Sequence, residues 1–192
     1  MKATAILIYN EFCNFEISVL LEILALSQKP IVIFAKDKQA VRSEEGITIL
    51  PDKSIHELDL ENYDSLVLPG AVDIREAIEN ENILEFIRKF NKESIIIGAI
   101  SVAPLLLLKS GVMGNRKFLA GVAKEDLYEE DFTSADLKNM IDWEENLKNP
   151  VPEGYILSDR IITAVSYDFI RWGVAFGRLL GIDIGAENFG LK

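Results

Sequence analysis

The stretch SIIIGAISVAPLLLLKSG, residues 94–111, passes from one apolar run into a second through a single hydroxyl group. The first run predicts a buried strand, and the second predicts a helix that stops near Gly111. Ser101 stands at the junction, with Ala99 and Ala103 two residues away on either side. A direct passage from strand to helix makes a sharp, strained turn, and small neighbours keep its apex free of collisions. The stretch therefore predicts an α/β fold with Ser101 projecting above the sheet.

Two interpretations of Ser101 stay open on spacing alone. At a nucleophile elbow, the free N–H groups and the dipole of the following helix stabilise negative charge at the apex. Serine is also a favourable residue for an ordinary helix N-cap, which carries no chemistry. Small residues after a strand are compatible with both.

Apolar runs and amphipathic stretches alternate along the whole chain, which indicates an α/β three-layer sandwich. We expect a mostly parallel sheet flanked by helices on both faces, flavodoxin-like, in a single domain over residues 1–192. Chemistry in such sheets gathers at the carboxyl ends of the strands. Asp73 and Glu76 have the spacing of a capping box for one helix, and Ser166 is placed to cap the last helix. Strands are expected at about 3–9, 30–35, 63–70 and 94–100, a hairpin-like excursion at 46–60, two short strands turning at 158–159, and helices at about 14–28, 73–90, 102–111 and 166–183.

Composition excludes several classes of function. The formal net charge is −11, and basic residues occur only in scattered pairs such as Arg116-Lys117, so we expect neither nucleic acid nor an anionic membrane as a partner. The apolar runs are shorter than the roughly 18 residues that a membrane-spanning helix needs. No Gly-x-Gly-x-x-Gly or P-loop pattern occurs, so no nucleotide cofactor is expected.

Cysteine and histidine each occur once. Cys13 alone makes an intramolecular disulfide impossible, which is compatible with a cytoplasmic location. Together with His56 it provides too few of the usual ligands for a zinc site, so no metal is expected. The acidic segment 124–149 is either a surface for a protein partner or a solvated insertion that covers the sheet edge.

Four segments, in this order, resemble the DJ-1/PfpI superfamily within the class I glutamine amidotransferase-like fold. The second segment contains the strand that ends in Leu-Pro-Gly, and the third resembles the nucleophile elbow of the family. The resemblance covers essentially the whole chain. The segments are residues 3–24, 44–71, 98–117 and 159–182.

The resemblance implies a particular site and assembly. Glu16 matches the acidic residue that exchanges a proton or hydrogen bond with the elbow side chain. The backbone N–H groups of Gly70, Ala71 and Val102 match an anion or oxyanion site. Members of the superfamily include peptidases, deglycases or glyoxalases, isocyanide hydratases and amidases, and a homodimer is implied.

The chain departs from the family pattern at two positions. The elbow residue is Ser101 where the family has cysteine, and the family histidine would fall near Gly121, where no imidazole is present. His56 lies in a segment far along the sheet from the elbow. Cys13, three residues before Glu16, is either a replacement thiol near the same crevice or a small packing residue.

Three hypotheses follow. In the first, the chain is a catalytically degenerate family member that binds a small molecule at the elbow or acts in stress or regulation. In the second, it is an active hydrolase or lyase in which Ser101 attacks or orients water and Glu16 transfers the proton. In the third, it is an interaction module that uses segment 124–149.

Overall fold

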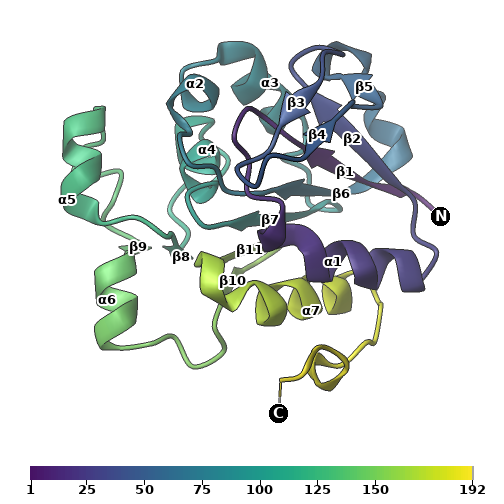
Figure 1. Cartoon of the computed structure of the whole chain (residues 1–192). Helices are drawn as coiled ribbons and strands as arrows, with labels where there is room; N and C mark the ends of the chain where they lie inside the picture. Colours follow the sequence, from purple (N-terminus) through teal and green to yellow (C-terminus); the bar gives the residue numbers. More distant parts are fainter. Residues whose placement is uncertain (192) are drawn as a thin grey trace.

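A seven-stranded sheet runs through the middle of the computed structural model, which describes residues 1–191 (Figure 1). The strand order is β10-β11-β7-β6-β1-β2-β5, and every neighbouring pair is parallel except β10 and β11. This architecture confirms the α/β prediction with a mostly parallel sheet. In the order of the sheet, the bounds are Ile156–Ser158, Ile161–Ala164, Ile96–Ile100, Tyr63–Leu68, Ala3–Leu7, Ile31–Ala35 and Lys53–Ser54.

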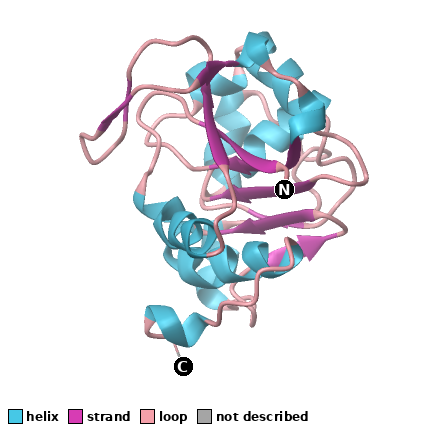
Figure 2. Ribbon diagram, turned by 90° about the vertical axis from the view of Figure 1, so that its right-hand side faces the viewer, coloured by secondary structure: helices cyan, strands magenta, loops and turns pink. Residues whose placement is uncertain are grey.

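Helices cover both faces of this sheet (Figures 1 and 2). Helices α1 (Phe15–Leu26) and α7 (Phe169–Leu179) pack against each other on one face. The other face carries α2 (Arg75–Ile78), α3 (Glu81–Lys89) and α4 (Pro104–Lys109). Strands that are covered on both sides bury nearly every side chain, which explains why β6 and β7 read as continuous apolar runs.

The helix predicted over residues 73–90 is two helices. Asp73 does not open a capping box, because the N-cap residue of α2 is Ile74 and the helix begins without a side-chain cap; the Asp73 carboxylate instead accepts the N–H of Arg75 at 2.9 Å. The chain leaves the helical region at Asn80, whose side chain accepts hydrogen bonds from Asn82 and Ile83 and caps α3. Each segment alone has helical spacing, but the buried residues of α3 (Ile83, Leu84 and Ile87) are out of phase with those of α2 (Ala77 and Ile78), and the prediction of a single helix did not take this change of phase into account.

Ser166 also plays a different part from the one predicted. It opens a short 3-10 helix, Ser166–Asp168, and α7 then begins at Phe169 without a side-chain cap. The two short strands that precede it turn at Asp159, as expected, with a φ of +57°.

Shorter elements complete the chain. The predicted excursion after β2 contains the antiparallel pair β3–β4 and the edge strand β5. Residues 118–148 form an arm at one side of the sheet, containing the parallel pair β8–β9 (Figure 1). The bounds are Val41–Arg42 for β3, Thr48–Ile49 for β4, Phe118–Leu119 for β8, Lys124–Leu127 for α5, Met140–Ile141 for β9 and Trp143–Lys148 for α6.

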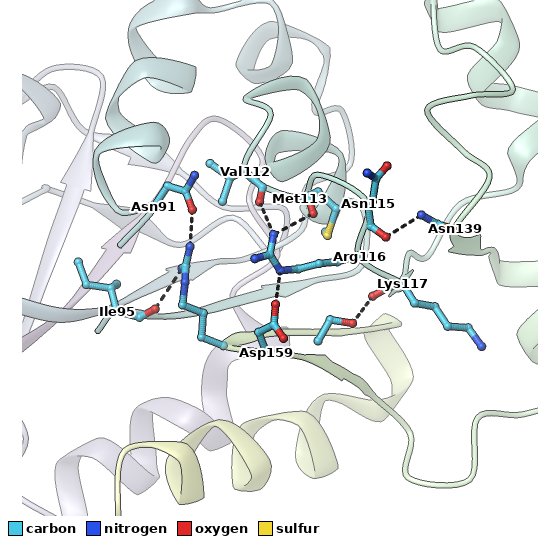
Figure 3. A network of polar contacts seen from close by, with 11 residues as sticks. Asn91, Ile95, Val112, Met113, Asn115, Arg116, Lys117, Asn139 and Asp159 are labelled. Atoms are coloured by element: carbon cyan, nitrogen blue, oxygen red, sulfur yellow. Dashed lines mark hydrogen bonds and ion pairs between the residues drawn. The ribbon is translucent and has the colours of Figure 1, made fainter. Parts of the chain in front are cut away.

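The basic pair at 116–117 belongs to a structural network (Figure 3). Nε of Arg116 donates to the carboxylate of Asp159 at 2.9 Å, and its Nη1 donates to the carbonyls of Val112 and Met113. Asp159 precedes the first residue of β11, so this network lies at the amino ends of the parallel strands. The elbow lies at their carboxyl ends. No helix among residues 1–191 is both long and apolar enough to cross a membrane.

Candidate active site at the elbow after β7

Ser101 follows β7 directly and has a φ of +61°, in the left-handed region that disfavours residues with a Cβ. Two backbone hydrogen bonds hold it there: its N–H donates to the carbonyl of Ala164 at 2.8 Å, and its carbonyl accepts the N–H of Gly121 at 2.8 Å. Such strain, of about 1–2 kcal/mol, persists where surrounding contacts over-determine the conformation. The strained turn predicted from the sequence is therefore present.

The helix after the elbow contributes less than the sequence indicated. Helix α4 has six residues and begins at Pro104, three residues beyond Ser101. Because the dipole effect falls off within the first turn, a short helix that starts this late offers little stabilisation to an anion at Ser101. Val102, which was predicted to donate its N–H, lies half-buried in the turn between strand and helix.

Glu16 reaches the elbow from the first turn of α1, and its side chain is 1 % exposed. Its Oε2 accepts the backbone N–H of Gly70 at 2.7 Å. Burial raises the pKa of this carboxyl from its ordinary value of 4.5 to about 7, against the lowering effect of hydrogen bonds from Gly70 and the Ser101 hydroxyl. The negative charges of Glu44 and Glu45 raise it further. Glu16 is therefore close to half-ionised at neutral pH.

Gly70 is the point at which these groups meet. A Cβ placed on it would lie 2.6 Å from Oε2 of Glu16 and 2.7 Å from Cβ of Ser101, so only glycine fits. The structure thus brings Gly70, Glu16 and Ser101 together at the ends of β6, α1 and β7. The Gly70 N–H, expected as a donor to an oxyanion, is already bound to Glu16. Ala71 is buried and pairs with Phe12 in an isolated antiparallel bridge.

Comparison with known proteins agrees with this geometry. The sequence model of the DJ-1/PfpI family matches residues 2–174. The chain belongs to the DJ-1/PfpI family.

Family relatives are distant in sequence and close in fold. The chain is 22 % identical over 151 residues to a glutathione-independent glyoxalase, DJR-1.2 of Caenorhabditis elegans, covering 79 % of this chain and 73 % of that protein. It is 27 % identical over 108 residues to the deglycase PfpI of Pyrococcus furiosus, covering 56 % and 65 %. Three of the curated relatives are matched over less than two thirds of their own length, one over 56 % and two over 65 %. The crystal structure of the DJ-1 superfamily protein Atu0886 of Agrobacterium tumefaciens superposes with a TM-score of 0.79 at 19 % identity, covering 99 % of this chain and 95 % of that one.

The position at which a histidine is expected in the DJ-1/PfpI pattern lies directly against the elbow. A Cβ on Gly121 would be 3.2 Å from Cα of Ser101 and 3.4 Å from its Oγ. His56, the sole histidine of the sequence, is exposed on a 3-10 helix after β5. In the sheet, β5 is separated from β7 by three strands. The elbow serine of this family member therefore has no imidazole beside it.

The contacts of Cys13 favour the packing interpretation over that of a replacement thiol for the DJ-1/PfpI elbow. Its side chain is 6 % exposed, and its Sγ donates a hydrogen bond to the carboxylate of Glu44. Burial raises the pKa of this thiol well above its usual range, and the bond to Glu44 and the charge of Glu16 raise it further. A thiol that stays protonated is a poor nucleophile, so the packing interpretation fits these contacts.

Sequence reasoning missed the loop that surrounds this cysteine. Glu44 and Glu45 reach the start of α1 from a distant turn, and Glu45 accepts the N–H of Phe15 at 2.8 Å. The only local signal was the Ser-Glu-Glu-Gly sequence, which ends at Gly46 with a φ of +88° and indicates a turn. A turn signal does not say which element its side chains will contact.

Proposed function

We propose that this chain is a DJ-1/PfpI protein that has lost the covalent chemistry of the family and binds a small carbonyl-bearing molecule at the elbow. The observation that supports this is the hydrogen bond between the buried Glu16 carboxyl and the Ser101 hydroxyl, with no imidazole beside them among residues 1–191. The protonated form of a buried carboxyl and the hydroxyl beside it can each donate a hydrogen bond to a carbonyl oxygen.

The chemistry of serine is the reason for expecting no covalent step. A cysteine thiol titrates near 8.5 and ionises readily in a favourable site, whereas a serine hydroxyl needs a general base, most often histidine. Glu16, with a pKa of about 7, is a weak base towards a hydroxyl group. Removal of a triad base slows catalysis by several orders of magnitude.

One observation favours a second candidate, an active hydrolase or lyase of the family. A carboxyl that titrates near neutral pH is matched to general acid–base work at that pH. In this candidate Ser101 attacks the substrate or orients water, and Glu16 transfers the proton. The N–H groups of Gly70, Ala71 and Val102 hold the oxyanion once Gly70 has exchanged its bond to Glu16 for one to the substrate.

Turnover assays separate the two candidates. Wild type, Ser101→Ala and Glu16→Gln are assayed with methylglyoxal, because one relative is a glyoxalase, and with a p-nitrophenyl ester. We expect wild-type turnover no faster than that of Ser101→Ala. Turnover in the wild type that is lost in Ser101→Ala would refute the proposal that covalent chemistry has been lost, and it would support the second candidate.

Binding is tested separately, by ligand-observed NMR with hydroxyacetone. We expect Ser101→Ala to retain a signal and Gly70→Ala to lose it, because the added Cβ would lie 2.6 Å from Oε2 of Glu16. Gly121→Leu, at a half-buried position, places its side chain against Ser101 from the loop after β8. It replaces Gly70→Ala in this test if Gly70→Ala does not fold. Equal hydroxyacetone signals in wild type and both blocked variants, each shown to be folded by thermal unfolding, would overturn binding at the elbow.

We also propose that the chain is a cytoplasmic homodimer. Membership of the DJ-1/PfpI family supports the dimer, and the single, unpaired cysteine is compatible with the compartment. Light scattering coupled to gel filtration distinguishes a dimer of 43 kDa, twice the chain mass of 21.5 kDa, from a monomer.

A further inference from the structure

A second cleft lies at the same edge of the sheet as the elbow but further along it. Its volume is about 340 Å³, and its walls are formed by residues 8–11 after β1, by residues 35–37 and 39–41 at and after β2, and by Asp73, Glu76 and Ala77 after β6. None of the groups at the elbow lines it. In the sheet order, β7 is two strands from β1 and three from β2, so those two strands lie about 10 and 14 Å from β7 across the sheet.

The topology of the sheet favours ligand binding at this place. The chain runs outward from β1 to β2 and then returns to β6 on the other side of β1. Successive connections therefore leave the carboxyl ends of β1 and β6 towards opposite faces, and α1 and α2 lie on opposite faces. Open parallel sheets bind ligands in the crevice at such a reversal of strand order.

The floor of the cleft is apolar and made partly of small residues. Ile8, Ala35, Ala77 and Ile83 line it, and each is buried. Alanine at two of these four positions leaves the space that a larger side chain would fill. A volume of 340 Å³ is within the range of small-molecule sites. The floor can therefore accept an aliphatic chain.

The rim is negatively charged. The carboxylates of Glu11, Asp37, Asp73 and Glu76 line the cleft, together with one ammonium group, that of Lys36. Asp73 is compensated by an ion pair with Arg75, which lies outside the lining. Across residues 1–191, none of the other three carboxylates has an ion-pair partner. The rim therefore has an excess of uncompensated negative charge, and it attracts cations.

We propose that this cleft binds an aliphatic amine of low molecular mass, with its methylene chain on the apolar floor and its ammonium groups at the carboxylates of the rim. The net charge of −11 adds to the attraction, because the field of the whole chain raises the local concentration of small cations. An anionic ligand is disfavoured by the same carboxylates.

Isothermal titration calorimetry with 1,4-diaminobutane tests this proposal on the full chain. We expect saturable binding of the diamine below about 10 mM and none of succinate, which has the same chain length and the opposite charge. Glu76→Gln removes one rim carboxylate and should weaken binding about fivefold, the effect of one pair of charges about 4 Å apart in water. Ala40→Leu, at an exposed lining position, should abolish binding by filling the cleft.

Glu79→Gln is the matched control, because Glu79 ends the same helix α2 and lies outside the cleft. It should bind the diamine within twofold of wild type. Ser101→Ala should also bind normally, so the result does not depend on the elbow. No heat of binding at about 10 mM, or equal affinities for wild type, Glu76→Gln and Ala40→Leu, would overturn the proposal.

Discussion

The substitution Glu16→Gln tests the electrostatics of the elbow through the stability of the fold. Glu16 is 1 % exposed, and its carboxyl titrates near pH 7 in the folded chain against 4.5 ordinarily. Glutamine has nearly the same shape, and its amide oxygen can still accept the N–H of Gly70. The substitution therefore removes the titration and preserves the packing.

The direction in which the free energy of unfolding changes with pH follows from proton binding. Between pH 4.5 and 7 the folded chain holds a proton on Glu16 that the unfolded chain has released, so the free energy of unfolding falls as pH rises through this window. Below the window both states are protonated, and above it both are ionised, with the buried charge left uncompensated. At 1.36 kcal/mol for each pH unit, wild type loses about 2–3 kcal/mol relative to Glu16→Gln between pH 5 and pH 8.

Urea unfolding followed by circular dichroism at pH 5, 6, 7 and 8 measures this difference. The wild-type free energy of unfolding should fall relative to that of Glu16→Gln as pH rises. Glu22→Gln, an exposed change on the same helix, should parallel wild type at each pH. A constant difference between wild type and Glu16→Gln over the four pH values would refute a raised pKa at the elbow.

Three further substitutions test the packing and the backbone by urea unfolding. Gly98→Ala places a Cβ 2.6 Å from the ring of Phe176 and should destabilise the chain by about 1–3 kcal/mol; an unchanged urea midpoint would contradict this contact. Gln28→Gly relieves a φ of +57° at an exposed position after α1 and should stabilise by about 0.5–1 kcal/mol, so a lower midpoint would be evidence against strain there. Asn80→Ala removes the cap of α3 and should cost about 1 kcal/mol, a loss that Asn80→Asp should largely avoid.

The order of helices and strands could be predicted from the sequence because the apolar pattern of each segment matches the way in which that segment is buried in the fold. The runs that became β6 and β7 are apolar throughout, and both are buried by helices on two faces. The turn at Ser101 could be predicted as well, since its small neighbours are adjacent in sequence. The break at Asn80 was missed although the apolar positions change phase there, because each flanking segment has helical spacing by itself.

The candidate site could be predicted only where family motifs mark it. Glu16 and Gly70 belong to such motifs, and the structure brings both to Ser101. The hydrogen bond between Cys13 and Glu44 joins residues 31 positions apart, and neither residue type nor spacing indicates that contact. The occupation of the Gly70 N–H by Glu16 is likewise a tertiary property. Pairings between distant loops depend on how the sheet brings them together.

Gly121 makes the proposed loss of chemistry difficult to reverse. Any side chain at that position begins with a carbon 3.2 Å from Cα of Ser101, so a regained imidazole requires the bend at Ser101 to shift by a few tenths of an ångström. A single substitution at either residue therefore does not restore both the thiol and the imidazole of the family pattern, and the two together also require that adjustment of the main chain.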